Sequence, residues 1–216
     1  MIHNRRHFIR GLSLSSAALF TTTGLYAEEL TRTATVEEGP FYPHQLPLDT
    51  DNDLLIVNDS ITPAVGEVAH LSGRLLDSRG EPVRNALIEI WEADTSGIYL
   101  AARQDQARFD KNFQGFGRFL TGSNGEYYFR TIKPSPYSGR PAPHVHFAVK
   151  LKGREKWTTQ LFVKGHPGNS RDGIYQRIAG EKAKATVTVE FGPMKGSRVG
   201  ELAARFDIVM GYTPEV

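Results

Sequence analysis

From residue 67 onward, the chain consists of short apolar segments separated by turn residues. Turn signals such as Asp77-Ser78-Arg79-Gly80, Thr95-Ser96-Gly97 and Ser123-Asn124-Gly125 recur between segments of strand length. Sequence patterns that favour a helix occur only at residues 176–184 and 198–203. Many short strands with regular turn signals are typical of a sandwich, so we predict an all-β, prealbumin-like fold. The expected strands lie in VAHLSGRLLD, ALIEIWEAD, GRFLTG, EYYFRTI, HVHFAVKL, TTQLFV, ATVTVEF and ARFDIVM.

The chain divides into three parts. Its 216 residues suit one domain with a sizeable core. Residues 28–66 contain Pro40, Pro43 and Pro47 and have little periodicity, which predicts an extended N-terminal arm that wraps the domain. Residues 67–216 form the predicted sandwich, with short helices near the C-terminus.

Residues 1–27 resemble a twin-arginine export signal. Arg5 and Arg6 are paired, Phe8 and Arg10 follow, and a mildly apolar stretch rich in Ser, Thr and Gly comes next. Cleavage after Ala27 would release the mature protein, so we expect export, to the periplasm. The alternative interpretation is a short amphipathic N-terminal helix. No later apolar run is long enough to span a membrane, so no membrane association is expected after removal of the signal.

Charge and cysteine content exclude several classes of function. The formal net charge is +2, and the three arginines of residues 1–27 account for it, so nothing indicates a nucleic-acid partner. The chain has no cysteine. Disulfides, thiolate metal sites, iron–sulfur clusters and cysteine nucleophiles are therefore excluded.

Two histidines stand one residue apart in RPAPHVHF, residues 140–147. Side chains alternate along a strand, so Val145 and Phe147 share one face while His144 and His146 share the other. Their Cα atoms would lie about 7 Å apart, which lets both rings reach one ion. Two unrelated histidines remain the alternative. Zinc, copper and iron all accept imidazole, so this pair alone does not name the metal.

Two tyrosines favour iron. Tyr137 ends the Pro-rich segment just before the histidines, and Tyr99 follows the turn in TSGIY. A phenol has a pKa near 10, so it becomes a good ligand only when a strong Lewis acid displaces its proton. Ferric iron does this well. Taken singly, either tyrosine also fits a half-buried packing residue.

These motifs together resemble the intradiol ring-cleavage dioxygenases, of the catechol 1,2- and protocatechuate 3,4-dioxygenase type. The similar stretches are EEGPFYP, the block that contains IEIWEAD and ends in Gly97-Ile98-Tyr99, NFQGFGRFLTGSNGEYYFRTIKPSPY, RPAPHVHF and TTQLFV. The resemblance covers nearly all of the mature chain. It implies a catalytic domain with non-haem Fe(III) that cleaves the ring of a small aromatic diol with O2, giving a cis,cis-muconate-type product. Family members commonly associate, so a homo-oligomer is expected.

The resemblance also implies the iron ligands. Tyr99 and Tyr137 match the two tyrosine ligands of the family, and His144 and His146 match the two histidine ligands. Tyr137 corresponds to the displaceable ligand, which takes up a proton and dissociates from the iron when the diol binds. It is therefore counted as a catalytic residue as well.

Other residues match the surroundings of the family's iron. Arg140 corresponds to the arginine that stabilises negative charge on the bound substrate, although RPAPH has one residue more than the RPAH form. Gln160 corresponds to a glutamine near the substrate and oxygen. Trp91, Pro40 and Tyr42 are expected to line the substrate pocket.

Two other functions are left open by the residues themselves. LSGRLLDSRGEPVRNALIEIWEAD alone also resembles a non-catalytic prealbumin-like module. His144 and His146 could instead hold zinc or copper with a carboxylate such as Glu92 or Asp94. The choice among catechol, protocatechuate and hydroxyquinol as substrate also stays open.

Overall fold

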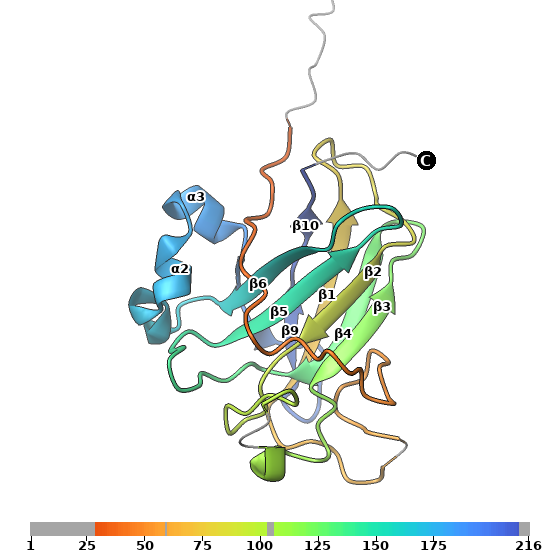
Figure 1. Ribbon diagram of the computed structural model, residues 1–216, viewed down its shortest axis with the longest axis vertical. Coiled ribbons are helices and arrows are strands. Elements are labelled where there is room, and N and C mark those ends of the chain that lie inside the picture. The colour runs from red at the N-terminus through yellow and green to blue at the C-terminus, as the bar shows by residue number, and fades with distance from the viewer. Residues whose placement is uncertain (1–28, 59, 103–105, 212–216) are drawn as a thin grey trace, which may run out of the picture.

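The computed structural model of the protein describes residues 29–58, 60–102 and 106–211. The predicted export signal, residues 1–27, lies outside the described residues. Two β-sheets pack face to face, which confirms the predicted sandwich (Figure 1). Within the described part of the chain, no helix is long and apolar enough to cross a membrane.

The first sheet is built around β1, which spans Val68–Leu76. On one side β1 pairs antiparallel with β4, and it also pairs parallel with β9 and β10. Strand β8 pairs antiparallel with β9 at the edge. The other strands of this sheet are β4 (Glu126–Ile132), β8 (Gly192–Pro193), β9 (Leu202–Arg205) and β10 (Ile208–Val209).

The second sheet has the order β3-β2-β5-β6-β7. Strand β5 lies at its centre and pairs antiparallel with β2 and with β6. These neighbours matter because they carry several of the predicted site residues. The strands are β2 (Leu87–Trp91), β3 (Phe116–Leu120), β5 (His144–Lys150), β6 (Trp157–Val163) and β7 (Thr188–Val189).

The inner faces of the two sheets form one apolar core. Alternate residues of each strand enter it, as expected for a pleated strand with one face toward a partner sheet. On β5 the buried core residues are Val145, Phe147 and Val149, as the alternation predicts. Leu71 of β1 and Phe129 of β4 meet them from the other sheet.

The last segment of the first sheet is interrupted at Phe206. Its backbone N–H donates to the Ser72 carbonyl at 2.8 Å, and its carbonyl accepts a hydrogen bond from the Tyr127 hydroxyl. A Cβ on Gly73 would lie 1.9 Å from that carbonyl oxygen, so only glycine allows this approach. The expected strand ARFDIVM is therefore split into β9 and β10.

The described residues of the arm, 29–58 and 60–66, carry only an isolated bridge, from Asp53 to Arg130 of β4, and residues 34–37 run along β6. Val36 donates its backbone N–H to the Thr158 carbonyl at 3.2 Å and accepts from the Thr158 hydroxyl at 2.9 Å. In Figure 1 the N-terminal part of the arm (red to orange) crosses the outer side of the sheet that contains β5 and β6. It therefore covers the face of β5 that points away from the core.

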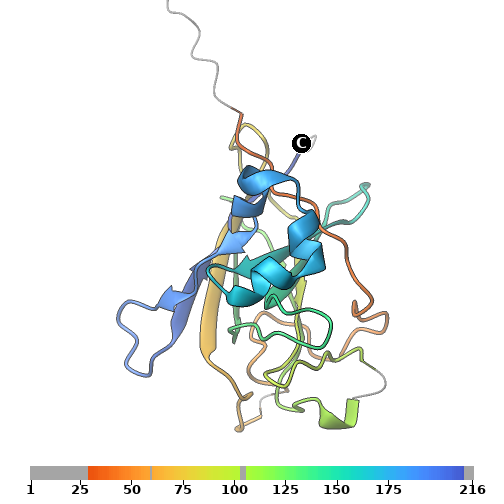
Figure 2. The ribbon, with the colours of Figure 1, turned by 90° about the vertical axis from the view of Figure 1, so that its left-hand side faces the viewer.

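The helices are short. They are η1 (Gln106–Arg108), η2 (Pro167–Arg171), α2 (Gly173–Arg177) and α3 (Gly180–Ala185). Helices α2 and α3 lie beside the β6 edge and face the viewer in Figure 2. The helix expected at 176–184 is thus divided into two pieces. The helix expected at 198–203 is wrong, because residues from Leu202 pair with β1 instead.

Candidate functional site

The two histidines of β5 lie side by side on its outer face. His144 and His146 are only 2% and 1% exposed, and their ring centroids are 4.9 Å apart. Val145, between them, faces the core. Both faces of β5 are therefore buried, the inner one by apolar side chains and the outer one by the arm and neighbouring loops.

Tyr99 is brought to the histidines by a tight turn after β2. The Asp94 carboxylate accepts backbone hydrogen bonds from Ser96 at 2.9 Å and Ile98 at 3.0 Å, which closes the turn. Gly97 has φ +77°, and a Cβ there would lie 2.9 Å from the Tyr137 Cβ. The turn therefore requires glycine, and it brings the loops of the two tyrosines into contact.

The oxygen of Tyr99 meets both imidazoles. Its hydroxyl lies 3.3 Å from His144 Nε2 and 3.1 Å from His146 Nε2. The Tyr137 ring centroid is 5.3 Å from that of Tyr99 and 5.6 Å from that of His144. The structure thus brings together all four residues that the sequence predicts as metal ligands.

The site keeps these four side chains neutral when no cation is bound. Burial, followed by the charge of Arg140, lowers the pKa of His144 to about 4, and burial and His144 lower that of His146 well below its usual value. Burial raises the pKa of Tyr99 well above its usual value, and burial also raises that of Tyr137, which Arg140 partly offsets. Neutral imidazoles offer lone pairs to a cation, and only a strong cation would ionise these phenols.

The donors fit a metal ion. His144 Nδ1 lies 2.7 Å from the Ala142 carbonyl, so it carries the proton and Nε2 is free to coordinate. Ligands at about 2.1 Å from an ion and at right angles are about 3 Å apart, close to the spacing around the Tyr99 oxygen. Among the described residues, His146 Nδ1 is buried with no hydrogen-bond partner. The Tyr99 oxygen faces both Nε2 atoms, so a cation placed among these three atoms could accept a lone pair from each of them.

The carboxylates considered for a zinc or copper site have other partners. Glu92 accepts from the Thr131 hydroxyl, and Asp94 holds the turn before Tyr99 and also accepts from the Asp110 N–H at 2.9 Å. Within the described ranges, no group of three or more His, Cys, Asp or Glu side chains could hold a metal. The donors that do stand beside the histidines are phenols.

Arg140 is held at the edge of the same cluster. It lies across a tight turn from Tyr137, with reciprocal backbone hydrogen bonds of 2.9 and 3.1 Å. Its Nε donates to Asp172 Oδ2 at 2.8 Å, and its Nη2 donates to Gln160 Oε1 at 2.7 Å. Gln160 in turn donates to the Glu37 carbonyl at 2.8 Å. The guanidinium is therefore fixed from three elements: its own loop, β6 and the start of α2.

Asp172 is a site residue that the sequence reasoning missed. Its side chain is fully buried, and its Oδ1 caps α2 by accepting from the Ile174 and Tyr175 N–H groups, each at 3.0 Å. Burial raises the pKa of Asp172, but hydrogen bonds from Arg140 and the backbone outweigh it and leave the pKa below its usual value. An aspartate followed by Gly-Ile-Tyr is a helix N-cap signal, and that signal could have drawn attention to it.

Aromatic rings of the arm and of β2 enclose the donors. Phe41, which the sequence reasoning also missed, stacks on Tyr99 with ring centroids 4.6 Å apart. Trp91 stacks on His146 at 4.9 Å, and Tyr42 meets the Trp91 ring edge-on at 5.1 Å. These contacts exclude water from the side of the cluster that faces the arm.

A comparison with protein families identifies the chain. The family model described as "Dioxygenase" (Dioxygenase_C) matches residues 37–211. The chain belongs to the intradiol dioxygenase family. That match covers the arm from Glu37 onward, both tyrosines, both histidines and all strands of the sandwich.

Curated relatives in the family act on different diols by name. The protocatechuate 3,4-dioxygenase beta chain of Burkholderia cepacia is 35% identical over 155 residues, which are 68% of this chain and 65% of the relative. The hydroxyquinol 1,2-dioxygenase of Corynebacterium glutamicum is 30% identical over 200 residues, 80% of this chain and 61% of the relative. The chain thus spans less than two thirds of the length of either relative.

A solved structure supports the fold of this family member. The 3-chlorocatechol 1,2-dioxygenase of Rhodococcus opacus superposes with a TM-score of 0.66, over 93% of this chain and 78% of that one. The sequence identity is 20%, so this likeness concerns the sandwich fold alone.

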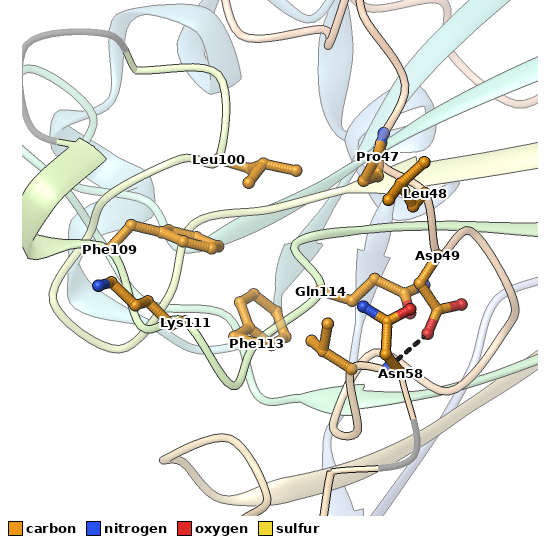
Figure 3. Close-up of a pocket in the computed structure, with 10 residues that line it drawn as sticks. Pro47, Leu48, Asp49, Asn58, Leu100, Phe109, Lys111, Phe113 and Gln114 are labelled. Atoms are coloured by element: carbon orange, nitrogen blue, oxygen red, sulfur yellow. Dashed lines mark hydrogen bonds between the residues drawn. The ribbon is translucent and has the colours of Figure 1, made fainter.

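Two hollows of this dioxygenase-family chain are lined in part by residues of the arm. The larger, of about 780 Å³, is lined by Pro40, Tyr42 and neighbouring arm residues together with Leu100 and Ala101. A second hollow, of about 380 Å³, lies between Phe109, Phe113 and the arm near Pro47 (Figure 3). Leu100, next to Tyr99, borders both hollows. Pro40 and Tyr42 therefore line a hollow, whereas Trp91 is buried between His146 and Tyr42. That these three residues line the substrate pocket stays a prediction.

Proposed function

We propose that this protein is a non-haem Fe(III) intradiol dioxygenase that cleaves the ring of a catechol-type substrate with O2. The product would be a cis,cis-muconate-type diacid, and both oxygen atoms enter it, so no external reductant is required. The observation that carries the proposal is the meeting of the Tyr99 oxygen with two neutral imidazole nitrogens at 3.1 and 3.3 Å. Family membership supports the same reaction class.

The four ligands would have unequal roles. Ferric iron, when bound by Tyr99, Tyr137, His144 and His146, would supply the Lewis acid on which the diol and O2 react. Tyr99 is buried under Phe41, whereas Tyr137 is only partly buried and stands on the loop that leads to Arg140. The more accessible phenolate oxygen of Tyr137 is thus the one that can accept a proton from an incoming diol. Tyr99 would remain in place.

Arg140 would stabilise negative charge on the substrate. Its guanidinium is 9% exposed and is oriented by Asp172 and Gln160 before any substrate arrives. A fixed cation in a site with little water stabilises developing oxyanions without reorganisation. Gln160 would act mainly by holding Arg140, because its own amide is already engaged by Arg140 and the Glu37 carbonyl.

Iron content and colour test this proposal. Purified protein should contain about one iron per chain, and phenolate-to-Fe(III) charge transfer should make it wine-red. Incubation with catechol, protocatechuate and hydroxyquinol should consume one O2 per ring cleaved for at least one of the three. Colourless protein that holds zinc and leaves all three diols intact would overturn the proposal.

We also propose that residues 1–27 export the folded protein to the periplasm, as a homo-oligomer of chains whose catalytic domain spans residues 67–216. The paired Arg5 and Arg6 support the twin-arginine route. This pathway carries proteins that have already folded. Replacing both by lysine should leave the protein in the cytoplasmic fraction. Equal periplasmic recovery of the variant would refute the export proposal.

A further inference from the structure

A fully buried carboxylate lies on the face of the second sheet that carries the histidines. Glu89 of β2 is 0% exposed and stands two residues before Trp91. The register pairs Trp91 with His146 and Glu89 with Ala148. All four side chains therefore share the outer face, but Glu89 has no role among the residues proposed above to bind iron or substrate.

Glu89 has partners from three other segments. Arg118 of β3 donates to Oε1 from Nε at 3.0 Å and from Nη2 at 2.8 Å, and Lys150 of β5 lies 2.9 Å from Oε2. The Tyr42 hydroxyl donates to Oε2 at 2.8 Å. A buried ion pair is seldom more stabilising than apolar packing of the same volume. What an apolar residue at this position would lose is the hydrogen bond that holds the arm.

Tyr42 passes this constraint to the metal donors through a series of ring contacts. Its ring stands at 86° to Trp91 with centroids 5.1 Å apart, and Trp91 lies parallel to His146, at 9° and 4.9 Å. The Tyr42 hydroxyl also accepts from Lys150 Nζ at 2.9 Å. Its ring is thus fixed at the hydroxyl by Glu89 and Lys150 and at the edge by Trp91.

The neighbours of Tyr42 in the arm contact the donors directly. Phe41 stacks on Tyr99 at an interplanar angle of 10°, and a Cβ on Gly39 would lie 3.4 Å from His146 Cε1. Lys156 lies 4.0 Å from the Tyr42 ring centroid and pairs with Glu38. The position of Tyr42 therefore determines how closely residues 39–41 cover the donors.

We propose that Glu89 and Tyr42 are positioning residues for His146 and Tyr99. Glu89 holds Tyr42, and Tyr42 holds Trp91 against the His146 ring. The hydrogen bond between Glu89 and Tyr42 also keeps Phe41 on Tyr99. The catalytic consequence rests on the proposed dioxygenase function, whereas the effect on Trp91 does not. Residues that orient metal ligands from outside the coordination sphere typically change metal affinity or activity by about 10- to 100-fold when altered.

Tyr42→Phe tests the proposal with the least disturbance, because it keeps the ring and leaves the Arg118–Glu89–Lys150 group intact. Only two tryptophans exist, so the metal-free protein has two indole N–H signals in a nitrogen-15 spectrum, which a Trp157→Phe variant assigns. Trp157 donates its indole N–H to Thr35, away from the donors, and serves as an internal control. We expect solvent exchange of the Trp91 N–H to rise at least about tenfold, with Trp157 unchanged.

Glu89→Gln is the second variant, and Arg177→Gln is the matched control. Arg177 also ties the arm, through a 3.4 Å ion pair with Glu37 in which both side chains are more than half exposed. Exposed pairs contribute little, so this control should leave Trp91 exchange unchanged. If Glu89→Gln fails to fold, Tyr42→Phe alone decides. Unchanged Trp91 exchange in folded Tyr42→Phe would overturn the proposal.

Iron-loaded protein gives the second readout. Both variants should bind iron about 10- to 100-fold more weakly, shift the charge-transfer band and lower kcat with KM nearly unchanged. A rise in KM confined to Tyr42→Phe would overturn positioning in favour of direct substrate contact, since Tyr42 also lines the larger hollow. If wild-type protein holds no iron, the dioxygenase proposal fails. Solvent exchange of the Trp91 N–H then decides by itself whether Glu89 and Tyr42 position Trp91.

Discussion

The two sheets of the sandwich share one core but have different outer faces. The outer face of β1 is half-exposed and carries His70, whose Nδ1 lies 2.6 Å from the Tyr128 hydroxyl. The outer face of β5 is buried under the arm, yet it carries His144 and His146. Polar side chains on an open face cost little, whereas buried ones need partners. Burying the two histidines on the covered face of β5 therefore costs stability, and their proposed function explains why they are there.

His146→Ala should have the largest effect on activity and a small one on folding. Loss of one imidazole from the donor set should lower turnover by about 1000-fold or more, equivalent to about 4 kcal/mol of lost metal-based stabilisation. The metal-free protein should remain folded, because the variant leaves Val145 and Phe147, the core residues on either side of His146, unchanged. Steady-state kinetics and iron analysis measure the first effect, and circular dichroism the second. Full activity with full iron content would remove His146 from the ligand set.

Phe147→Ala should reverse that pattern, one residue away on the same strand. Phe147 is fully buried and contacts Phe206 and Tyr127 in the core, with ring centroids 5.0 and 6.0 Å apart. Its truncation should lower the free energy of unfolding by about 3–5 kcal/mol. Urea titration of metal-free protein measures this, with Phe147→Leu as the milder control. A larger loss of turnover per folded molecule than in His146→Ala would break the division between the faces.

Asp172→Asn should separate the orientation of Arg140 from the capping of α2. Asparagine still caps a helix, but its neutral amide no longer pairs with the Arg140 guanidinium, which lies 2.8 Å from Asp172 Oδ2. Turnover should fall by about 10- to 100-fold, because small misplacements of catalytic groups have effects of this size. Asp172→Ala also loses the helix cap, so its free energy of unfolding should be about 1 kcal/mol lower than that of Asp172→Asn. Wild-type kcat in Asp172→Asn would show that Arg140 needs no such partner.

Glu92→Gln probes a polar group within the core itself. Burial raises the pKa of Glu92 to about 8, despite the hydrogen bond from Thr131. Between pH 4.5 and 8 the folded protein therefore keeps a proton that the unfolded chain releases, so stability falls as pH rises through this window. The variant should lack that fall and be more stable than wild type at pH 8 by about 1–3 kcal/mol. Urea titrations at pH 5 and pH 8 measure the free energy of unfolding of both proteins. An equal change between the two pH values in wild type and variant would contradict a neutral, buried Glu92.

Tyr128→Phe should have the smallest effect, since it alters only the open face of the first sheet. It removes the hydroxyl that meets His70, at a cost of about 0.5–1 kcal/mol in unfolding free energy. Iron content and kcat should not change. A loss of turnover would show that the open face is coupled to the donors.

Strand periodicity explains what could be predicted. The alternation in HVHFAVKL places Val145 and Phe147 in the core and both histidines opposite, and the structure agrees. The stretch at 198–203 misled, because Leu202 and Ala203 favour helices in isolation but pair with β1 in the fold. Asp172 could not be linked to Arg140, because only tertiary structure brings residues 32 apart together. The contact of Tyr42 with Glu89, 47 positions away, escaped prediction for the same reason.

The pairing of the arm with β6 also bears on the order of folding. The hydrogen bond from Thr158 of β6 to Val36 spans 122 positions, and the bond from Val209 of β10 to Thr33 of the arm spans 176. Tyr99 and the two histidines are separated by fewer than 50 positions. Closing long loops is entropically costly, so we expect the sandwich to form first and the arm to dock last. Iron would then enter before the arm closes, and pulsed hydrogen exchange should find the Val36 amide protected later than those of β5.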